Sequence, residues 1–156
     1  MSKSLKRVKS ALEAAGAEVH VLEMDGETRT AAQAAEQAGC QLDQIAKSII
    51  FQGEASGTIY LFVTAGGNQV DVEKASALTG EPLGRADGKT VRAVTGFAIG
   101  GVSPVGHLSP PHSYFDPRLL EFGAVWAAAG TPRHVFEIAP DLLCKLAEAQ
   151  TADFTA

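Results

Sequence analysis

Lys47 is the one charged residue of the largely apolar segment "QIAKSIIF". Lysine is seldom fully buried unless its charge is paired, so the position admits two interpretations. Either the side chain extends to solvent from the end of a strand, or it places a cation at the mouth of a pocket. In the second case the ammonium would face a carbonyl oxygen or a phosphate.

A glycine-rich loop follows later in the chain, in "FAIGGVSPVGH", residues Phe97 to His107. It lacks the spacing of a Walker loop or of a GxGxxG dinucleotide fingerprint. Gly100 and Gly101 permit positive φ and close backbone approach, and Pro104 removes a donor and stiffens the turn. The loop either presents free amide N–H groups to a carbonyl or carboxyl oxygen, as an oxyanion site does, or is a wide turn between strands.

Further polar candidates lie near these segments. Ser48, Ser103 and His107 are close in sequence to the lysine and the loop, but no G-x-S-x-G elbow or Ser/His/Asp order accompanies them. The turn "AAGTPRH" resembles the first loop in composition, and we expect it to lie beside that loop.

The histidines and cysteines do not form a metal-ligand pattern. His20, His107, His112 and His134 lack ligand spacing. Cys40 and Cys144 have no CxxC spacing, and we interpret both as reduced thiols. The sequence therefore predicts a site without a metal or cofactor.

Composition limits the class of protein. The 156 residues, 46% of them hydrophobic and 20% charged, are typical of one globular domain, residues 1–156. A net charge of −5 excludes an extended binding interface with DNA or RNA. Any nucleic-acid contact should be confined to a short end, a local basic patch or a complex assembled by a partner. No segment approaches the ~20 apolar residues that span a bilayer, and the basic N-terminus lacks the apolar region of a signal peptide, so we expect a cytoplasmic protein.

Predicted helices and strands are interspersed along the chain. Helices are predicted at Ser4–Ala15, at "AAQAAEQAG" after a cap at Thr28 or Thr30, at Val72–Leu78, at "GKTVRAVTG" after Asp87, at Arg118–Phe122 and from Pro140. Extended segments are predicted at "EVHVLE", Ile45–Phe51, Thr58–Thr64, Phe97–Ile99, "HSYFDP", "AVWAAAG" and "HVFEI". The central hairpin and the late strand pair favour a mixed sheet, hence an α+β or mixed α/β fold.

Four segments together resemble the YbaK/ProX family: "QIAKSIIF", "QVDVEKASALTG", "VTGFAIGGVSPVGH" and "AAGTPRHVFEIAPDLL". The resemblance runs from about Leu5 to Leu146. Members of this family are free-standing relatives of the editing domain of bacterial prolyl-tRNA synthetases. The resemblance implies a single domain with a curved, barrel-like mixed sheet flanked by helices. It also implies trans-editing, which is hydrolysis of the ester that joins a wrong amino acid to the terminal adenosine of a tRNA, commonly the tRNA for proline.

The resemblance also assigns roles to residues. Lys47 matches the essential residue of the family, and the glycine-rich loop lines the aminoacyl pocket. The implied substrate-binding residues are Gly100, Gly101, Val102, Ser103, Pro104, Gly106, His107, Met24, Ser48, Gly130, Thr131 and His134. The hypothesis is that Lys47 and the amides around Gly101 stabilise the oxyanion while water attacks. The implied partners are the aminoacyl-tRNA acceptor end and prolyl-tRNA synthetase, with no membrane and no DNA.

Two positions depart from the subgroup that removes cysteine. Met24 stands where that subgroup has an aromatic residue, and Val135 where it has an acidic one. One or two side chains can redirect a small pocket, so alanine, serine, threonine or a non-protein amino acid are the alternatives. Arg133 is the better candidate for a phosphate contact, whereas Lys3, Lys6, Arg7 and Lys9 are interpreted as a solvated helix face.

Two other functions stay open from the sequence. One is a binding module without hydrolytic activity that serves a synthetase or tRNA complex. The other is a hydrolase of a different small ester, which is favoured if the protein has no affinity for tRNA.

Overall fold

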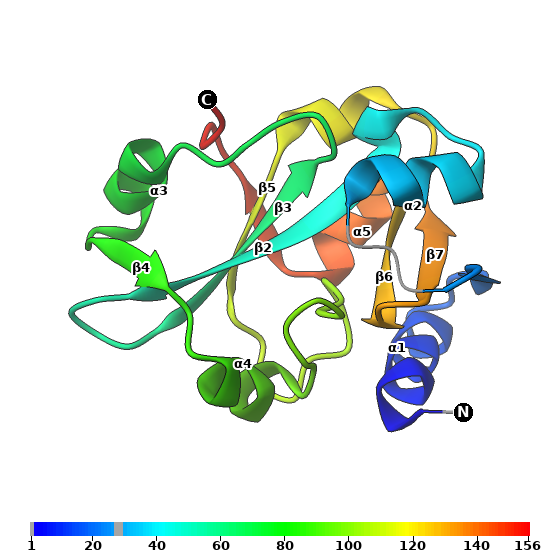
Figure 1. The fold of residues 1–156 in the computed structure, drawn as a ribbon, viewed down its shortest axis with the longest axis horizontal. Helices are drawn as coiled ribbons and strands as arrows, with labels where there is room; N and C mark the ends of the chain where they lie inside the picture. The colour runs from blue at the N-terminus through cyan, green and yellow to red at the C-terminus, as the bar shows by residue number, and fades with distance from the viewer. Residues whose placement is uncertain (1, 27–29) are drawn as a thin grey trace.

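The computed structural model describes residues 2–26 and 30–156, which form a mixed eight-stranded sheet with helices around it (Figure 1). The predicted mixed fold class is therefore confirmed. The strands are β1 (His20–Glu23), β2 (Ile45–Gly53), β3 (Ile59–Ala65), β4 (Leu83–Arg85), β5 (His112–Phe115), β6 (Val125–Thr131), β7 (His134–Ile138) and β8 (Ala149–Thr151). The helices are α1 (Lys3–Ala14), α2 (Ala31–Ala38), α3 (Val72–Thr79), α4 (Gly88–Thr95) and α5 (Pro140–Leu146), with short 3-10 helices η1 (Leu42–Gln44) and η2 (Pro117–Glu121).

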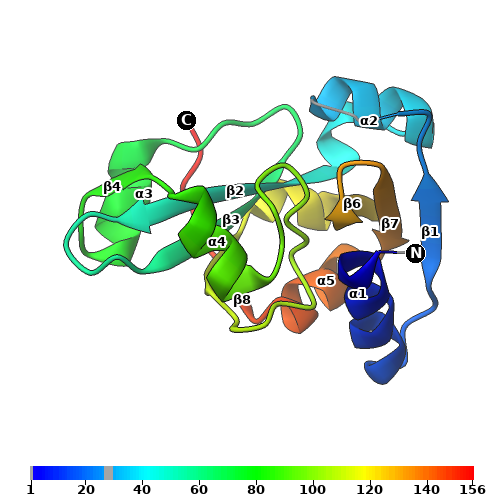
Figure 2. The same cartoon turned by 60° about the horizontal axis from the view of Figure 1, so that its bottom comes forward.

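The sheet has the order β1-β7-β6-β2-β3-β5-β8, and β4 pairs with β2 outside this path. Pairs β2–β6, β3–β5 and β5–β8 are parallel, and the others are antiparallel. Figure 2 shows β1 and β7 turned steeply away from the direction of β2 and β3. This strong bend agrees with the curved sheet that the sequence resemblance implied.

One edge of β2 is only partly paired. On that edge β2 pairs with β6 at Ile45 and Ala46, and with β4 from Phe51 to Gly53. Residues 47–50 between them have no partner strand there among the described residues, although β3 pairs along their other edge. The sheet therefore contains a window, and Lys47 is the first residue in it.

Most element ends follow the predicted signals. Thr30 caps α2 in a capping box with Gln33, while the alternative cap, Thr28, lies outside the described residues. Asp87 accepts the amide N–H of Thr90 at the start of α4. Gly96 ends α4 with φ +82°, a left-handed conformation that strongly favours glycine.

Other predictions need correction. Phe97–Ile99 is not a strand: Phe97 is fully buried, Ile99 is 60% exposed, and Gly101 N–H closes a turn on the Ala98 carbonyl. The apolar residues here anchor a loop instead of pairing with a neighbour. The predicted helix at Arg118–Phe122 is the 3-10 helix η2, and the three-residue strands β4 and β8 were not anticipated.

The main core lies between α1 and the concave part of the sheet. Leu5, Val8 and Leu12 of α1 are buried in one cluster with β3 and β6 residues. Each such side chain contributes about 1.5–3 kcal/mol when it leaves water, which is enough to fix α1 against the sheet. None of the described helices is long and apolar enough to cross a membrane.

Candidate active site

A cavity of about 240 Å³ opens at the window in β2. It is lined by Thr30, Ala31, Ala34, Ile45, Ala46, Lys47, Ser48, Ile49, Gly100, Val102, Trp126, Ala127, Ala128 and Val135. The structure thus brings Lys47 and part of the glycine-rich loop to the walls of one cavity.

Lys47 is half-buried, and its ammonium does not simply extend into solvent. Its Nζ donates a hydrogen bond of 2.6 Å to the backbone carbonyl of Asn68. Burial lowers the pKa of Lys47 from its ordinary value, and the nearby carboxylates of Asp116 and Asp43 limit that shift. The side chain is therefore held by the turn that follows β3.

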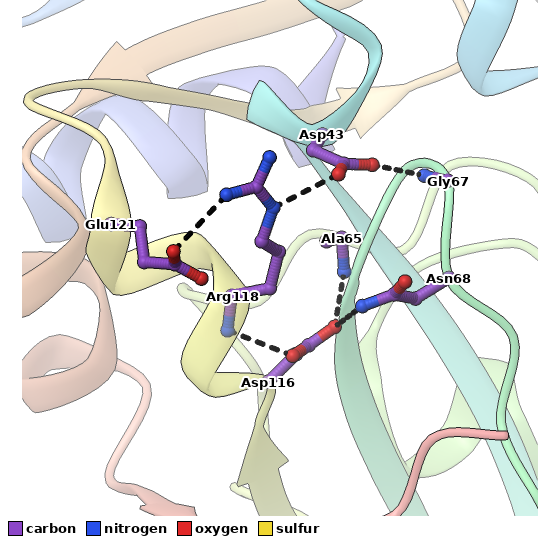
Figure 3. A network of polar contacts seen from close by, with 7 residues as sticks. All are labelled: Asp43, Ala65, Gly67, Asn68, Asp116, Arg118 and Glu121. Atoms are coloured by element: carbon purple, nitrogen blue, oxygen red, sulfur yellow. Dashed lines mark hydrogen bonds and ion pairs between the residues drawn. The ribbon is translucent and has the colours of Figure 1, made fainter.

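A buried carboxylate holds this turn in place (Figure 3). Asp116 is 2% exposed. Its Oδ2 accepts the amide of Ala65 at 3.0 Å and Nδ2 of Asn68 at 2.9 Å, and its Oδ1 accepts the amide of Arg118 at 2.9 Å. Three donors satisfy the buried acid, and one of them belongs to the residue whose carbonyl binds Lys47.

A second carboxylate fixes the same turn from its other side. Asp43 accepts Gly67 N–H at 2.8 Å and Nε of Arg118 at 3.0 Å, and Arg118 also pairs with Glu121 at 3.2 Å (Figure 3). The hydrogen bond from Arg118 holds the pKa of Asp43 below its usual range. A Cβ at Gly66 would lie 2.1 Å from the Leu42 carbonyl oxygen, so only glycine allows this close approach.

One amide of the glycine-rich loop is used differently from the prediction. The Gly101 N–H, which was expected near the oxyanion, donates to the Ala98 carbonyl at 3.0 Å inside the loop. The amides of Gly100 and Val102 donate to no described residue, and both residues line the cavity. A Cβ at Gly101 would lie 3.1 Å from Cα of Thr131. The loop therefore packs on the β6–β7 turn, as predicted.

The later residues of the loop lie behind the cavity wall. Ser103 and Pro104 are buried, and Ser103 Oγ accepts the amide of Val105 at 3.2 Å. His107 Nε2 donates to the Ser103 carbonyl. Burial lowers the pKa of His107 to about 4, and the charge of Arg7 adds to this shift. His107 is therefore neutral near pH 7, and its Nε2 hydrogen is committed within the loop.

Arg7 of α1 holds both ends of the loop. Its Nε donates to the Gly106 carbonyl at 2.7 Å, its Nη2 donates to the Gly96 carbonyl at 2.8 Å, and its guanidinium lies 4.6 Å from the Phe97 ring centroid. Such a stacked, two-carbonyl contact uses the flat fork of arginine. The interpretation of Arg7 as part of a solvated face is therefore wrong.

Three predicted residues lie at a different, larger cavity or beside it. Thr131 and His134 line a cavity of about 600 Å³, together with Arg133 and Lys9. Thr131 Oγ1 lies 2.7 Å from His134 Nδ1. Gly130 packs on α1, where a Cβ would meet the Ser4 carbonyl oxygen at 2.8 Å.

Met24 lies behind the wall of the smaller cavity. It is buried in a cluster with Ala34, Ile45 and Val135, which line that cavity directly. Met24 therefore does not line the cavity but supports its wall.

The sequence reasoning missed the residues that give the cavity its size. Ala31 and Ala34 of α2 line it together with Trp126, Ala127 and Ala128 of β6. The available signal was the alanine richness of "AAQAAEQA" and "WAAAG", because small side chains leave room between closely packed elements. No motif indicates which of these alanines would face a ligand.

Ser48 adds an unusual polar group to the wall. Its Oγ is buried and has no hydrogen-bond partner among the described residues. A buried hydroxyl without a partner loses about 1–3 kcal/mol relative to one that is satisfied. Ser48 is therefore a lining residue whose hydroxyl is left unsatisfied by the described residues.

The described residues contain no group of three or more His, Cys, Asp or Glu side chains that could hold a metal ion, and Cys40 and Cys144 are free thiols. The residues that line the cavity beside Lys47 include that cation, Gly100 and Val102 with their unused amides, and Ser48 with its unpartnered hydroxyl. Such groups can bind a carbonyl oxygen and stabilise negative charge that develops on it.

Comparison with known proteins gives consistent results. A family model described as an aminoacyl-tRNA editing domain matches residues 25–146. The YwhH protein of Bacillus subtilis is 35% identical over 137 residues, which cover 88% of this chain and 87% of YwhH. EbsC of Enterococcus faecalis, whose name proposes a Cys-tRNA(Pro)/Cys-tRNA(Cys) deacylase, is 26% identical over 127 residues. These residues cover 81% of this chain and 77% of EbsC.

A solved structure is similar over the whole chain. The crystal structure of a proposed trans-editing enzyme for prolyl tRNA synthetase is 46% identical, with a TM-score of 0.91, and the match covers 100% of this chain and 99% of that one. The fold and the sequence therefore point to the same relatives.

Proposed function

Because this chain belongs to the aminoacyl-tRNA editing domain family, we propose that it is a trans-editing deacylase that hydrolyses the ester of a mischarged tRNA. The substrate that fits best is the tRNA for proline carrying a small non-cognate amino acid. The observation that carries the proposal is that Lys47 lines one cavity together with Gly100 and Val102, whose amides donate to no described residue. Relatives described as a Cys-tRNA deacylase and a trans-editing enzyme support the reaction class.

The proposed mechanism needs little covalent chemistry from the protein. An aminoacyl ester is already activated, so positioning and oxyanion stabilisation supply most of the acceleration. Lys47 and the amides of Gly100 and Val102 bind the carbonyl oxygen. Water attacks the carbonyl carbon, the bond to the ribose oxygen breaks, and that oxygen takes up a proton.

No protein base is assigned to the attacking water. His107 is the histidine of the loop itself, and its Nε2 hydrogen is committed to the Ser103 carbonyl behind the wall. We assign the proton transfer to a hydroxyl group of the substrate's own ribose, which lies next to the ester. A variant that lacks the imidazole should therefore retain hydrolysis as long as the loop stays folded.

The walls favour a small acyl side chain. Alanines of α2 and β6 and the side chain of Val135 surround the space next to Lys47. An apolar pocket discriminates weakly between near-isosteres, about 10–200-fold per methylene. Alanine is the best-fitting substrate, and serine or threonine would place a hydroxyl near Ser48.

The net charge of −5 fits a limited contact with the tRNA. Only the single-stranded acceptor end enters the cavity, and prolyl-tRNA synthetase is the proposed partner that presents the rest. The substrate would place this activity in the cytoplasm.

Deacylation of a panel of charged tRNAs tests the proposal. The tRNA for proline is charged with alanine, cysteine, serine or proline and incubated with wild-type protein and with Lys47→Ala. We expect turnover of the alanyl ester, little turnover of the prolyl ester, and loss of activity in the variant. Binding without turnover would indicate a non-catalytic module instead. Neither binding nor turnover would indicate a hydrolase of another small ester.

A further inference from the structure

A second cavity, of about 230 Å³, lies along the same window in β2. It shares Ser48, Ile49, Gly100 and Val102 with the cavity that contains Lys47. The two cavities are therefore neighbours, and the glycine-rich loop and the unpaired edge of β2 form their common wall.

The lining of the second cavity differs in chemistry from that of the first. Ile50 and Ile99 add branched aliphatic surface, and the side chain of Ile99 is 60% exposed. Arg85, at the end of β4, also lines this cavity, and its exposed side chain has no hydrogen bond or ion pair with the described residues. An apolar slot with an uncommitted cation at its rim suits a flat ring that carries a phosphate.

We propose that this second cavity is the subsite for the terminal adenosine nucleotide of the tRNA. The inference rests on the proposed function, since it concerns the other half of the same substrate. Ile50 and Ile99 pack against the faces of the base, as apolar side chains do for bases held outside a helix. Arg85 binds the phosphate on the 5′ side of that nucleotide through its fork of N–H donors.

The arrangement of the two cavities matches the construction of the substrate. An aminoacyl-tRNA end has an acyl part and a nucleoside part that meet at one ester. The acyl part lies in the alanine-lined cavity with Lys47, the nucleoside part lies beside Arg85, and the ester spans the common wall. Ser48 belongs to this wall, and its buried Oγ has no hydrogen-bond partner among the described residues.

Equilibrium binding of AMP tests the subsite without requiring turnover. We expect AMP to bind the wild-type protein, Arg85→Ala to weaken that binding about tenfold, the size of a lost charge-assisted hydrogen bond, and Ile99→Ser to weaken it several-fold. Lys47→Ala should bind AMP as the wild type does. Inorganic phosphate should compete with AMP far more weakly than unlabelled AMP does, because it lacks the base.

Matched controls separate the subsite from general surface effects. Arg92→Ala removes an exposed arginine of α4, and Leu108→Ser removes an apolar side chain that is 61% exposed; neither residue lines the two cavities. Both controls should bind AMP within about twofold of the wild type. In deacylation assays, Arg85→Ala and Ile99→Ser should raise KM and leave kcat nearly unchanged, because they alter binding remote from the ester.

The outcomes distinguish this inference from the proposed function. If AMP does not bind, or binds equally to Arg85→Ala and Ile99→Ser, the subsite is wrong even if charged tRNA is hydrolysed. If inorganic phosphate competes with AMP as strongly as unlabelled AMP does, the cavity binds only the anion, and the assignment of a nucleoside subsite is wrong. If AMP binding depends on Arg85 and Ile99 but no charged tRNA is hydrolysed, the result supports the nucleotide subsite and contradicts the deacylase function.

Discussion

At the scale of single residues, the position of Lys47 depends on groups that do not reach the cavity. Asp116 binds the side chain of Asn68, and the carbonyl of Asn68 binds the Lys47 ammonium. Asp116 is therefore a positioning residue, and its effect on hydrolysis should act through the turn after β3.

The substitution Asp116→Asn tests this positioning. The asparagine side chain keeps one acceptor oxygen, but its other terminal group is an NH₂ donor that cannot accept a hydrogen bond. Of the three N–H groups that donate to Asp116, at least one is then left unpaired. We expect a loss of about 1–3 kcal/mol in the free energy of unfolding and a lower rate constant for hydrolysis even where the variant is fully folded. Chemical denaturation and single-turnover deacylation measure the two effects.

Asp153→Asn is the matched control, because Asp153 pairs with Lys74 at an exposed site. Its effect on stability should be within about 1 kcal/mol, and its hydrolysis rate should be normal. Folded Asp116→Asn with a wild-type rate would show that the network does not position Lys47.

His107 gives the fold a pH dependence of known sign. Its pKa is lowered to about 4 in the folded protein, against about 6.5 in an unfolded chain. Between these two pKa values the unfolded state binds a proton at His107 and the folded state does not. The free energy of unfolding therefore falls as the pH drops from 6.5 towards 4. Between pH 7 and pH 5 this group should remove about 2 kcal/mol.

Urea denaturation at pH 7 and pH 5 measures that loss. His107→Gln should show a smaller loss over the same interval, because glutamine does not titrate. Equal losses in the wild type and in His107→Gln would contradict the burial of a neutral imidazole.

The sequence located some of these residues and not others. Lys47 could be predicted because a charge in an apolar strand is unusual. Gly100 could be predicted because its loop is rich in glycine, which permits close backbone approach. That Gly101 N–H closes a turn, and that Arg85 reaches the same window, depends on loop conformation and strand order. Neither is encoded in local composition.

At the scale of elements, helix α1 determines where the glycine-rich loop lies. Arg7 binds the carbonyls of Gly96 and Gly106, and the family match begins only at residue 25, after α1. The clamp therefore comes from outside the segment that defines the family.

Replacing Arg7 should separate the loop from α1. Arg7→Lys keeps the charge but cannot reach two carbonyls and stack on Phe97 at the same time. We expect a stability loss of about 1–3 kcal/mol from the unpaired carbonyls and a lower kcat/KM, measured by thermal unfolding and by steady-state deacylation. Lys6→Ala, at an exposed position on the same helix, should change neither; an Arg7→Lys protein with normal kcat/KM would refute the clamp.

Element prediction succeeded where local signals are strong. The hairpin of β2 and β3 and the capped helices α2 and α4 were read from alternation and from caps. β4 has three residues, too few to display alternation, and it forms one end of the window. The window itself was therefore not predictable from local pattern.

At the scale of the whole molecule, the negative net charge limits how the tRNA binds. If only the acceptor end is held, with one or two phosphate contacts, salt should weaken binding modestly. We expect log KM to rise with log salt concentration with a slope of about 1–2. Steady-state kinetics from 50 to 300 mM salt, roughly the range over which such slopes are measured, would give this value, and a slope of about 6 or more would require a broad tRNA interface.

The single-turnover rate of alanyl-tRNA hydrolysis tests the central claim most directly. Lys47→Met keeps the length and apolar stem of the side chain but removes the ammonium, and Lys89→Met removes an exposed lysine that lines neither cavity. The rate constant should fall about 10²–10³-fold in Lys47→Met and stay unchanged in Lys89→Met. A Lys47→Met protein that hydrolyses the ester at the wild-type rate would contradict a role for this cation in the reaction.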